Sequence, residues 1–142
     1  MEITSCMEDY LEAVLILKER NKVARVKDLS ALLQVKTPTV NSALKCLTDK
    51  GLIEHEHYGY IDLTVLGEKI AKDIFCKHQA LTHFLEKILG VDKKEAAKDA
   101  CRMEHTIGVQ TFTKLRKFVK FIEDKPNIIK GFNHGYIKRG TH

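Results

Sequence analysis

The segment TPTVNSALKCLTDKGLI, residues 37–53, constrains the fold more than any other part of the sequence. Thr37 is a good helix N-cap, and Pro38 suits the first helical position, where its missing N–H costs nothing. Gly51 follows LTDK, and a glycine just after a helix typically ends it. The sequence therefore predicts a helix over residues 37–50.

The flanking segments place this helix in a larger motif. VKDLSALL predicts a short helix over residues 26–33, followed by a turn at residues 34–36. EHEHYGYIDLT alternates in polarity around Tyr58-Gly59 and predicts a β-hairpin over residues 53–63. A short helix, a tight turn, a second helix and a hairpin are the order of a winged helix-turn-helix, whose second helix enters the major groove of DNA.

The second helix has one apolar face and one polar face. Val40, Leu44 and Leu47 share the apolar face, which leaves short hydroxyl and amide side chains and lysines for contacts to phosphates and base edges. A polar face that only meets solvent is the alternative. We predict that the following residues contact DNA: Lys36, Thr37, Pro38, Thr39, Asn41, Ser42 and Lys45. The hairpin histidines, His55 and His57, are expected in solvent or near phosphate.

The rest of the chain is predicted to be helical. We expect helices over residues 5–20, 64–89, 92–107 and 109–124, with Thr64 capping the second of them. The Gly-rich polar tail GFNHGYIKRGTH, residues 131–142, is expected to be mobile. The predicted fold is mainly α, with a winged helix-turn-helix DNA-binding domain over residues 1–63 and a helical domain over residues 64–142.

Composition limits the class of protein. The 142 residues suffice for one domain or two small ones, and a net charge of +5 is compatible with nucleic-acid binding without being diagnostic of it. No apolar run approaches the ~20 residues that cross a bilayer, and the N-terminus lacks the regions of a secretory signal. We expect a soluble cytoplasmic protein. The four cysteines form no C-x-x-C pair, and each is expected by default to be a buried small hydrophobe.

CRMEH, residues 101–105, ends an alanine-rich helix in an unusual way. Helical spacing puts Cys101, Glu104 and His105 on one face with Ala97 and Ala100, and that face is expected to pack inward. An exposed helix end is the alternative for Glu104 and His105.

Two other places carry similar anomalies. His78 lies in the middle of an apolar stripe of the 64–89 helix, and Asp9 and Glu12 lie one turn apart near the N-terminus. A satisfied core histidine and a solvated acidic pair are the alternatives. Together with CRMEH, however, these residues form a set of carboxylates, imidazoles and one thiol that suits Fe²⁺ or Mn²⁺ at five or six coordination. A bound cation would offset the several kcal/mol that burying unpaired carboxylates costs.

The chain resembles the diphtheria toxin repressor and manganese transport regulator family of metal-dependent repressors. The resemblance rests on MEDYLEAVLIL, TPTVNSALKCLTDKGLI, LTVLGEKIA, KHQALTHFLEKILGV and CRMEH, in register over nearly all of residues 7–123. It implies a homodimer in which each subunit has an N-terminal winged helix and a helical metal-binding and dimerisation domain. Divalent metal is then the corepressor, and the dimer binds palindromic operators of metal-uptake genes.

The resemblance also implies a ligand set by position. The manganese-type ligands match Asp9, Glu12, His78, Glu104 and His105, whereas Cys101 stands, as in iron-type members, where manganese-type members place a carboxylate. The separate ancillary site of iron-type members is incomplete, with Thr82 and Ala97 at two of its ligand positions, and we expect no SH3-like third domain. The thiol shifts the preference towards Fe²⁺ over Mn²⁺.

Two other classes of protein are alternatives. A winged-helix repressor gated by an organic ligand would use the polar cluster only structurally. A metalloenzyme is disfavoured, because the sequence lacks a nucleophile elbow, a phosphate-binding glycine loop and an H-E-x-x-H helix. We therefore predict that the protein is not an enzyme.

Overall fold

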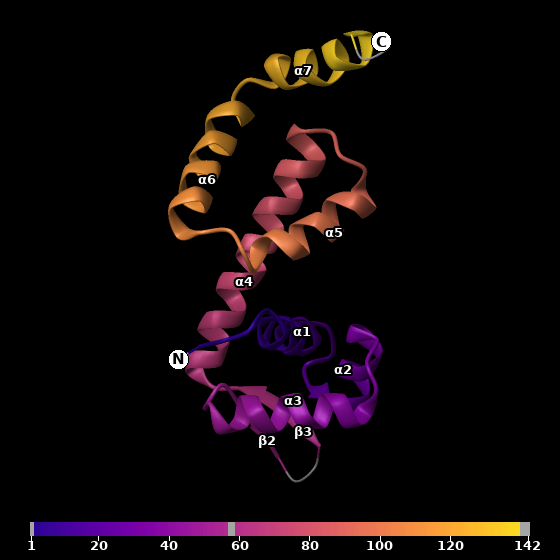
Figure 1. Ribbon diagram of the computed structural model, residues 1–142, viewed down its shortest axis with the longest axis vertical. Coiled ribbons are helices and arrows are strands. Elements are labelled where there is room, and N and C mark those ends of the chain that lie inside the picture. Colours follow the sequence, from indigo (N-terminus) through magenta and orange to yellow (C-terminus); the bar gives the residue numbers. More distant parts are fainter. Residues whose placement is uncertain (1, 57–58, 140–142) are drawn as a thin grey trace. The chain divides into compact units, whose positions relative to one another are not determined.

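The computed structural model describes residues 2–56 and 59–139, in which helices predominate (Figure 1). The chain forms two compact units, Met1–Phe75 and Cys76–His142, which meet within the helix α4 (Val65–His83). No helix of the described residues is long and apolar enough to cross a membrane.

The first unit is a winged helix-turn-helix, as predicted. Its elements follow in the order α1 (Ser5–Asn21), β1 (Ala24–Arg25), α2 (Val26–Leu33), α3 (Thr37–Asp49), β2 (Ile53–His55), β3 (Tyr60–Leu63) and the first part of α4. The strands form an antiparallel sheet in the order β1-β3-β2. β1 was not predicted, because a two-residue strand is too short to show an alternating pattern.

Both the helices and the sheet of this unit contribute side chains to its core. One face of α1 supplies Leu11 and Val14, α2 supplies Leu29, and α3 supplies its apolar face. Leu52, Ile53 and Ile61 close the core from the sheet side. α3 is thus held rigidly by its apolar side, and its polar side is left for other contacts.

The start of α3 differs from the prediction. Lys36, not Thr37, is the N-cap: its backbone is extended, and its carbonyl accepts from Val40 N at 3.1 Å. Thr37 therefore opens the helix and Pro38 lies in its first turn, where proline is still tolerated. The end of the helix is as predicted, because Gly51 takes a φ of +71°, a conformation that favours glycine.

The second unit is helical throughout its described part. After the rest of α4 come a π-helical turn η1 (Phe84–Ile88), α5 (Lys93–Glu104), α6 (Val109–Glu123) and α7 (Pro126–Arg139). Thr64 caps α4 as predicted, since its Oγ1 accepts from Gly67 N at 3.1 Å. α5 ends at Glu104 rather than near residue 107, because the N–H groups of Thr106 and Ile107 both turn back to the Met103 carbonyl.

Residues 126–139, which include most of the tail expected to be mobile, are helical. These residues form α7, and Asn133 Nδ2 ties it to η1 by donating to the Ile88 carbonyl at 3.3 Å. Pro126 begins this helix as well as following α6, because proline suits a first helical position. Residues 140–142 lie outside the described residues.

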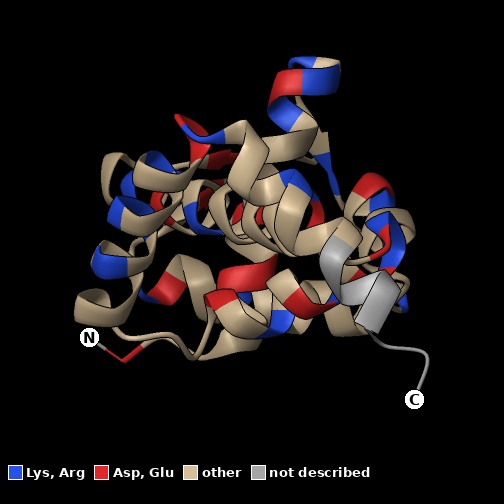
Figure 2. Cartoon of the chain, turned by 90° about the horizontal axis from the view of Figure 1, so that it is seen from above, with Lys and Arg blue, Asp and Glu red and all other residues tan. Residues whose placement is uncertain are grey.

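The core of the second unit is small. Leu81, Leu85, Ala96 and Ala100 form it, and α6 and α7 keep several large apolar side chains exposed, among them Val109, Phe118, Phe121, Ile128 and Phe132. Both signs of charge occur on helices throughout the chain (Figure 2), in agreement with its modest net charge of +5.

Candidate metal centre and DNA-binding surface

The inward row of α5 ends in a carboxylate. Ala96, Ala100 and Glu104 are buried at intervals of four residues, and Ala97 and Cys101 are half-buried beside them. The predicted inward face is therefore present, but its most buried line of residues runs through Ala96 and Ala100 rather than through Ala97 and Cys101. Glu104 is the only buried charged residue among the described residues, with 1% of its surface exposed.

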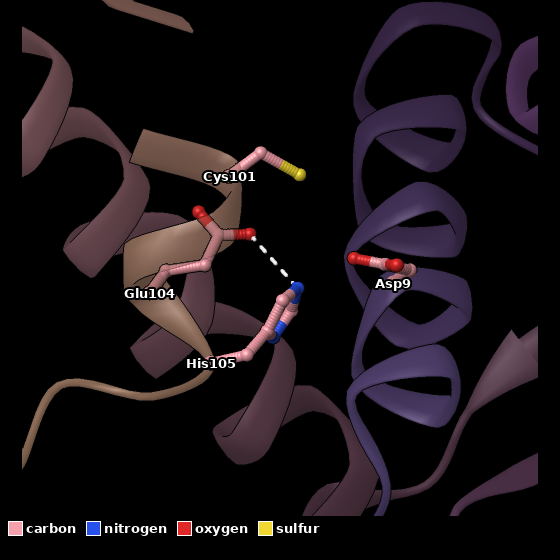
Figure 3. A group of neighbouring side chains, drawn as sticks. All are labelled: Asp9, Cys101, Glu104 and His105. Atoms are coloured by element: carbon pink, nitrogen blue, oxygen red, sulfur yellow. Dashed lines mark ion pairs between the residues drawn. The ribbon is translucent and has the colours of Figure 1, made fainter. Parts of the chain in front are cut away.

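Two histidines lie beside the Glu104 carboxylate. His78 Nδ1, from α4, is 2.7 Å from Glu104 Oε2. His105 Nε2 is 3.5 Å from Glu104 Oε1, the ion pair drawn as a dashed line in Figure 3. His105 itself caps α5, so that the end of the helix aims its ring back at the carboxylate. Among the described residues, the buried Oε1 accepts no hydrogen bond.

Cys101 completes the cluster in this unit. Its Sγ, one carboxylate oxygen of Glu104 and one ring nitrogen of His105 lie within 4.8 Å of one another (Figure 3). A thiol, a carboxylate and two imidazoles are a donor set that divalent transition metals accept. The buried Oε1 without a hydrogen bond fits the same interpretation, since a bound cation would satisfy it. These residues therefore fit a metal ion.

Asp9 and Glu12 lie in the first unit. They are half-buried and one turn apart on α1, on a helix whose neighbouring side chains Tyr10 and Leu11 are buried. Each of them takes part in at least one polar or electrostatic interaction with another group.

At the predicted ancillary positions the structure shows no further ligand cluster among the described residues. Thr82 Oγ1 donates to the His78 carbonyl at 2.7 Å, and Ala97 offers no ligand atom. The default burial of cysteines is wrong for Cys6 and Cys76, which are exposed. A small apolar side chain does not ensure burial at the edge of a unit with so small a core.

The predicted DNA-contacting residues share one property. All of them are exposed, whereas Val40, Leu44 and Leu47 on the other side of α3 are at most 1% exposed; the exposed set is Lys36, Thr37, Pro38, Thr39, Asn41, Ser42 and Lys45. His55 is also exposed, and His57 lies outside the described residues. α3 thus presents short polar side chains and lysines on a rigid support.

One exposed arrangement of the first unit was missed by the sequence analysis. Arg25 of β1 lies over the ring of Tyr60, with its Cζ 5.0 Å from the ring centroid. The pairing of Arg25 with Tyr60 in the sheet brings them together, and β1 itself was not predicted. No periodic signal in the sequence connects residues 35 positions apart.

The fold and the clusters define a class of protein: a winged-helix DNA-binding regulator with a candidate metal centre in its helical part. The chain belongs to the iron-dependent repressor family. The family's N-terminal DNA-binding domain matches residues 2–61, and its metal-binding and dimerisation domain matches residues 64–131.

Relatives of similar length agree with this family. The HTH-type transcriptional regulator MntR of Lysinibacillus sphaericus is 30% identical over 127 residues, covering 89% of this chain and 91% of the relative. The transcriptional regulator MntR of Escherichia coli O157:H7 is 37% identical over 114 residues, covering 80% and 73%. An HTH-type transcriptional regulator of Methanocaldococcus jannaschii is 35% identical over 124 residues, covering 87% and 99%.

Solved structures share the fold. The manganese regulator SloR has a TM-score of 0.73 at 26% identity, with 85% of this chain and 55% of that chain covered. ScaR with bound Cd²⁺ has a TM-score of 0.67 at 30% identity, with 81% and 54% covered. The chain therefore spans about half the length of these solved chains.

The family distinguishes between the classes that the sequence left open. It consists of metal-dependent transcriptional repressors, which supports a metal-dependent repressor over one gated by an organic ligand. Its members are transcriptional regulators rather than enzymes.

Proposed function

We propose that this protein is a divalent-metal-dependent repressor that works in the cytoplasm. As a metal-loaded homodimer it binds palindromic operator DNA and controls genes of iron or manganese homeostasis. The observation that carries the proposal is Glu104, a buried carboxylate with an imidazole near each oxygen and a thiol close by, in a metal-binding and dimerisation domain. The proposed boundary between the two domains lies at residues 63 and 64.

The proposed ligand set draws on both units. From the second unit it takes the residues clustered around Glu104, and from the first it takes two carboxylates of α1; the full set is Asp9, Glu12, His78, Cys101, Glu104 and His105. The half-buried position of Asp9 and Glu12 supports their inclusion, because carboxylates removed from water need a partner charge.

Ligands from both units give a mechanism for control. α1 packs directly on α2 and α3, the helices that read DNA. A bound ion supplies positive charge that offsets the repulsion among the carboxylates. Carboxylates of α1 that share their ion with α4 and α5 would fix the DNA-reading helices relative to the dimer core. In a dimer this sets the two α3 helices about one helical turn of DNA apart, about 34 Å.

The effect on DNA binding follows from linkage. The ligand residues would favour the arrangement in which they can share an ion. The population of that arrangement would rise only as far as its metal affinity exceeds that of the other arrangements. The exposed side chains of α3, among them Asn41 and Ser42, then meet base edges, and its lysines meet phosphates.

Cys101 supports Fe²⁺ over Mn²⁺ as the physiological metal. A thiolate favours the softer, later metal, whereas an all-carboxylate and imidazole set suits Mn²⁺. Two of the relatives carry the name MntR, and SloR is a manganese regulator, so the single thiol is the feature on which this preference rests.

The test is an anaerobic operator-binding titration with Fe²⁺, with Mn²⁺ and with a chelator, together with a count of metal per subunit. Wild type should require metal and respond at a lower concentration of Fe²⁺ than of Mn²⁺. Cys101→Asp should reverse this order, and the control Cys76→Ser, at an exposed thiol of α4, should not. Chelator-resistant operator binding would contradict the proposed function, and an unchanged order in C101D would contradict the role of Cys101.

A further inference from the structure

Arg25 is held in place on the exposed side of the winged-helix unit. It lies in β1 directly opposite Tyr60 of β3, in the antiparallel register that also pairs the buried Ala24 with Ile61. Because successive residues of a strand face opposite sides, Arg25 and Tyr60 share the outer face of the sheet. Arg25 Nη2 donates to Tyr60 Oη at 3.1 Å, and its Cζ is 5.0 Å from the centroid of the Tyr60 ring.

This contact leaves most of the guanidinium unused. An arginine side chain has five N–H donors in a planar fork, and the bond to Tyr60 Oη uses one of them. Among the described residues, no carboxylate lies within 4.0 Å of the Arg25 guanidinium. Acidic residues do share this face of the sheet. Asp62 is paired with Lys18, and Glu56 lies on the far side of Tyr60 from Arg25, where its N–H donates to the Tyr60 carbonyl at 3.0 Å.

The position of Arg25 in the fold is also informative. It is the residue immediately before α2, the first helix of the helix-turn-helix, and its own side chain makes no cap hydrogen bond. In this motif the second helix enters the major groove while the first helix crosses the DNA backbone. Tyr60 belongs to the hairpin that follows the second helix. An exposed, pre-oriented guanidinium thus stands between the two elements that flank α3.

We propose that Arg25 contacts a backbone phosphate of the operator and that Tyr60 is its positioning residue. The proposal rests on the proposed function, and it adds a contact outside the predicted α3 set. Guanidinium groups bind phosphate bidentately, and a side chain already held in one orientation loses less entropy on binding. The contact is independent of base sequence, so it contributes to affinity and register rather than to specificity.

The first experiment measures the salt dependence of DNA binding for wild type and Arg25→Ala. The slope of log affinity against log salt should become less negative by about 0.9 for each phosphate contact removed. For a dimer in which Arg25 of both subunits contacts DNA, the change is about 1.8. The control is Arg20→Ala, an exposed arginine at the end of α1, which removes the same charge and should leave the slope unchanged. R25A should lose the same factor on the operator and on a duplex of scrambled sequence, at least about tenfold for each.

The second experiment tests the role of Tyr60 by a double-mutant cycle. Tyr60→Leu removes both the ring and the hydroxyl and should weaken binding without changing the salt slope, and Tyr60→Phe, which keeps the ring, should recover most of the loss. In the R25A background Y60L should have no further effect. Additive losses in the double variant would overturn the positioning role.

The outcomes separate this inference from the proposed function. Binding to scrambled DNA does not depend on the proposed metal response. The slope of log affinity against log salt on this DNA is therefore measured with and without metal, and the effect of R25A on it should be the same in both conditions. Metal-independent operator binding would overturn the proposed function alone. A slope in R25A equal to that of R20A, with melting temperatures near wild type for both, would overturn the phosphate contact alone.

Discussion

The substitution Glu104→Gln tests the metal centre without disturbing its shape. Gln has nearly the same volume as Glu and keeps an acceptor oxygen for His78, now 2.7 Å from Oε2, but it carries no charge. Burying a carboxylate is costly, and Oε1 accepts no hydrogen bond among the described residues. The metal-free variant should therefore melt no lower than metal-free wild type.

The metal response should change strongly. At a free metal concentration 100 times its dissociation constant, binding stabilises the folded wild type by about 2.7 kcal/mol. For a chain of this size that raises the melting temperature by roughly 5–11 °C, at about 2–4 °C per kcal/mol. Loss of a hydrogen-bonded partner of a ligand already weakens metal binding by up to about 100-fold. Loss of the ligand itself should weaken it at least as much, so the same metal concentration should stabilise E104Q by no more than about 0.4 kcal/mol.

The assay is thermal unfolding followed by circular dichroism in an anaerobic cell, with Mn²⁺ or with chelator. The control is Glu95→Gln, which removes an exposed carboxylate from the first turn of the same helix and should keep the full metal shift. A metal shift in E104Q equal to that of wild type would refute the assignment of Glu104 as a ligand.

Three further predictions concern the first unit. Asn41→Ala should weaken operator binding by about 1–3 kcal/mol in fluorescence anisotropy and leave binding to scrambled DNA unchanged, because Asn41 is exposed on α3 and is expected to read a base edge; equal losses on both duplexes would contradict this. Leu44→Ala should cost about 2–5 kcal/mol in urea unfolding, since its side chain is buried in the core, and a loss within 0.5 kcal/mol, roughly the surface range, would contradict the packing of α3. The hydrogen bond from Lys18 is the main cause that lowers the pKa of Asp62 below its ordinary 3.8. The pair therefore stabilises the fold above that pH, and this contribution is lost as the pH falls through the lowered pKa. Asp62→Asn should make stability less sensitive to acid below about pH 4, and melting temperatures with the same pH dependence in D62N and wild type would refute this.

The winged helix could be predicted from the sequence because its signals are local. The proline and glycine that bound α3, and the helical spacing of its apolar residues, act within a few positions of one another. The errors arose where local signals compete or are too short. Lys36 rather than Thr37 caps α3, and β1 exists only through its pairing with β3.

In the second unit, tertiary contacts decide more of the structure than local sequence signals do. The glycine-rich segment from residue 131 onward looks like a tail, yet residues 126–139 form α7, whose Asn133 is bonded to a carbonyl of η1 that lies 45 positions earlier. Such a tertiary contact has no signature in periodicity. For the same reason CRMEH could be recognised as anomalous from its own spacing, whereas the approach of His78 to Glu104 depends on the packing of α4 against α5.

The central claim is that metal and operator binding are coupled through carboxylates of α1. The most direct measurement is operator affinity with metal and with chelator for wild type, Glu12→Gln and the control Glu19→Gln, an exposed carboxylate of the same helix. Metal should raise the affinity of wild type and E19Q by roughly 5- to 150-fold, the usual range of a coupling between two sites, and should leave E12Q unchanged. An E12Q variant that responds to metal as strongly as wild type would contradict the account.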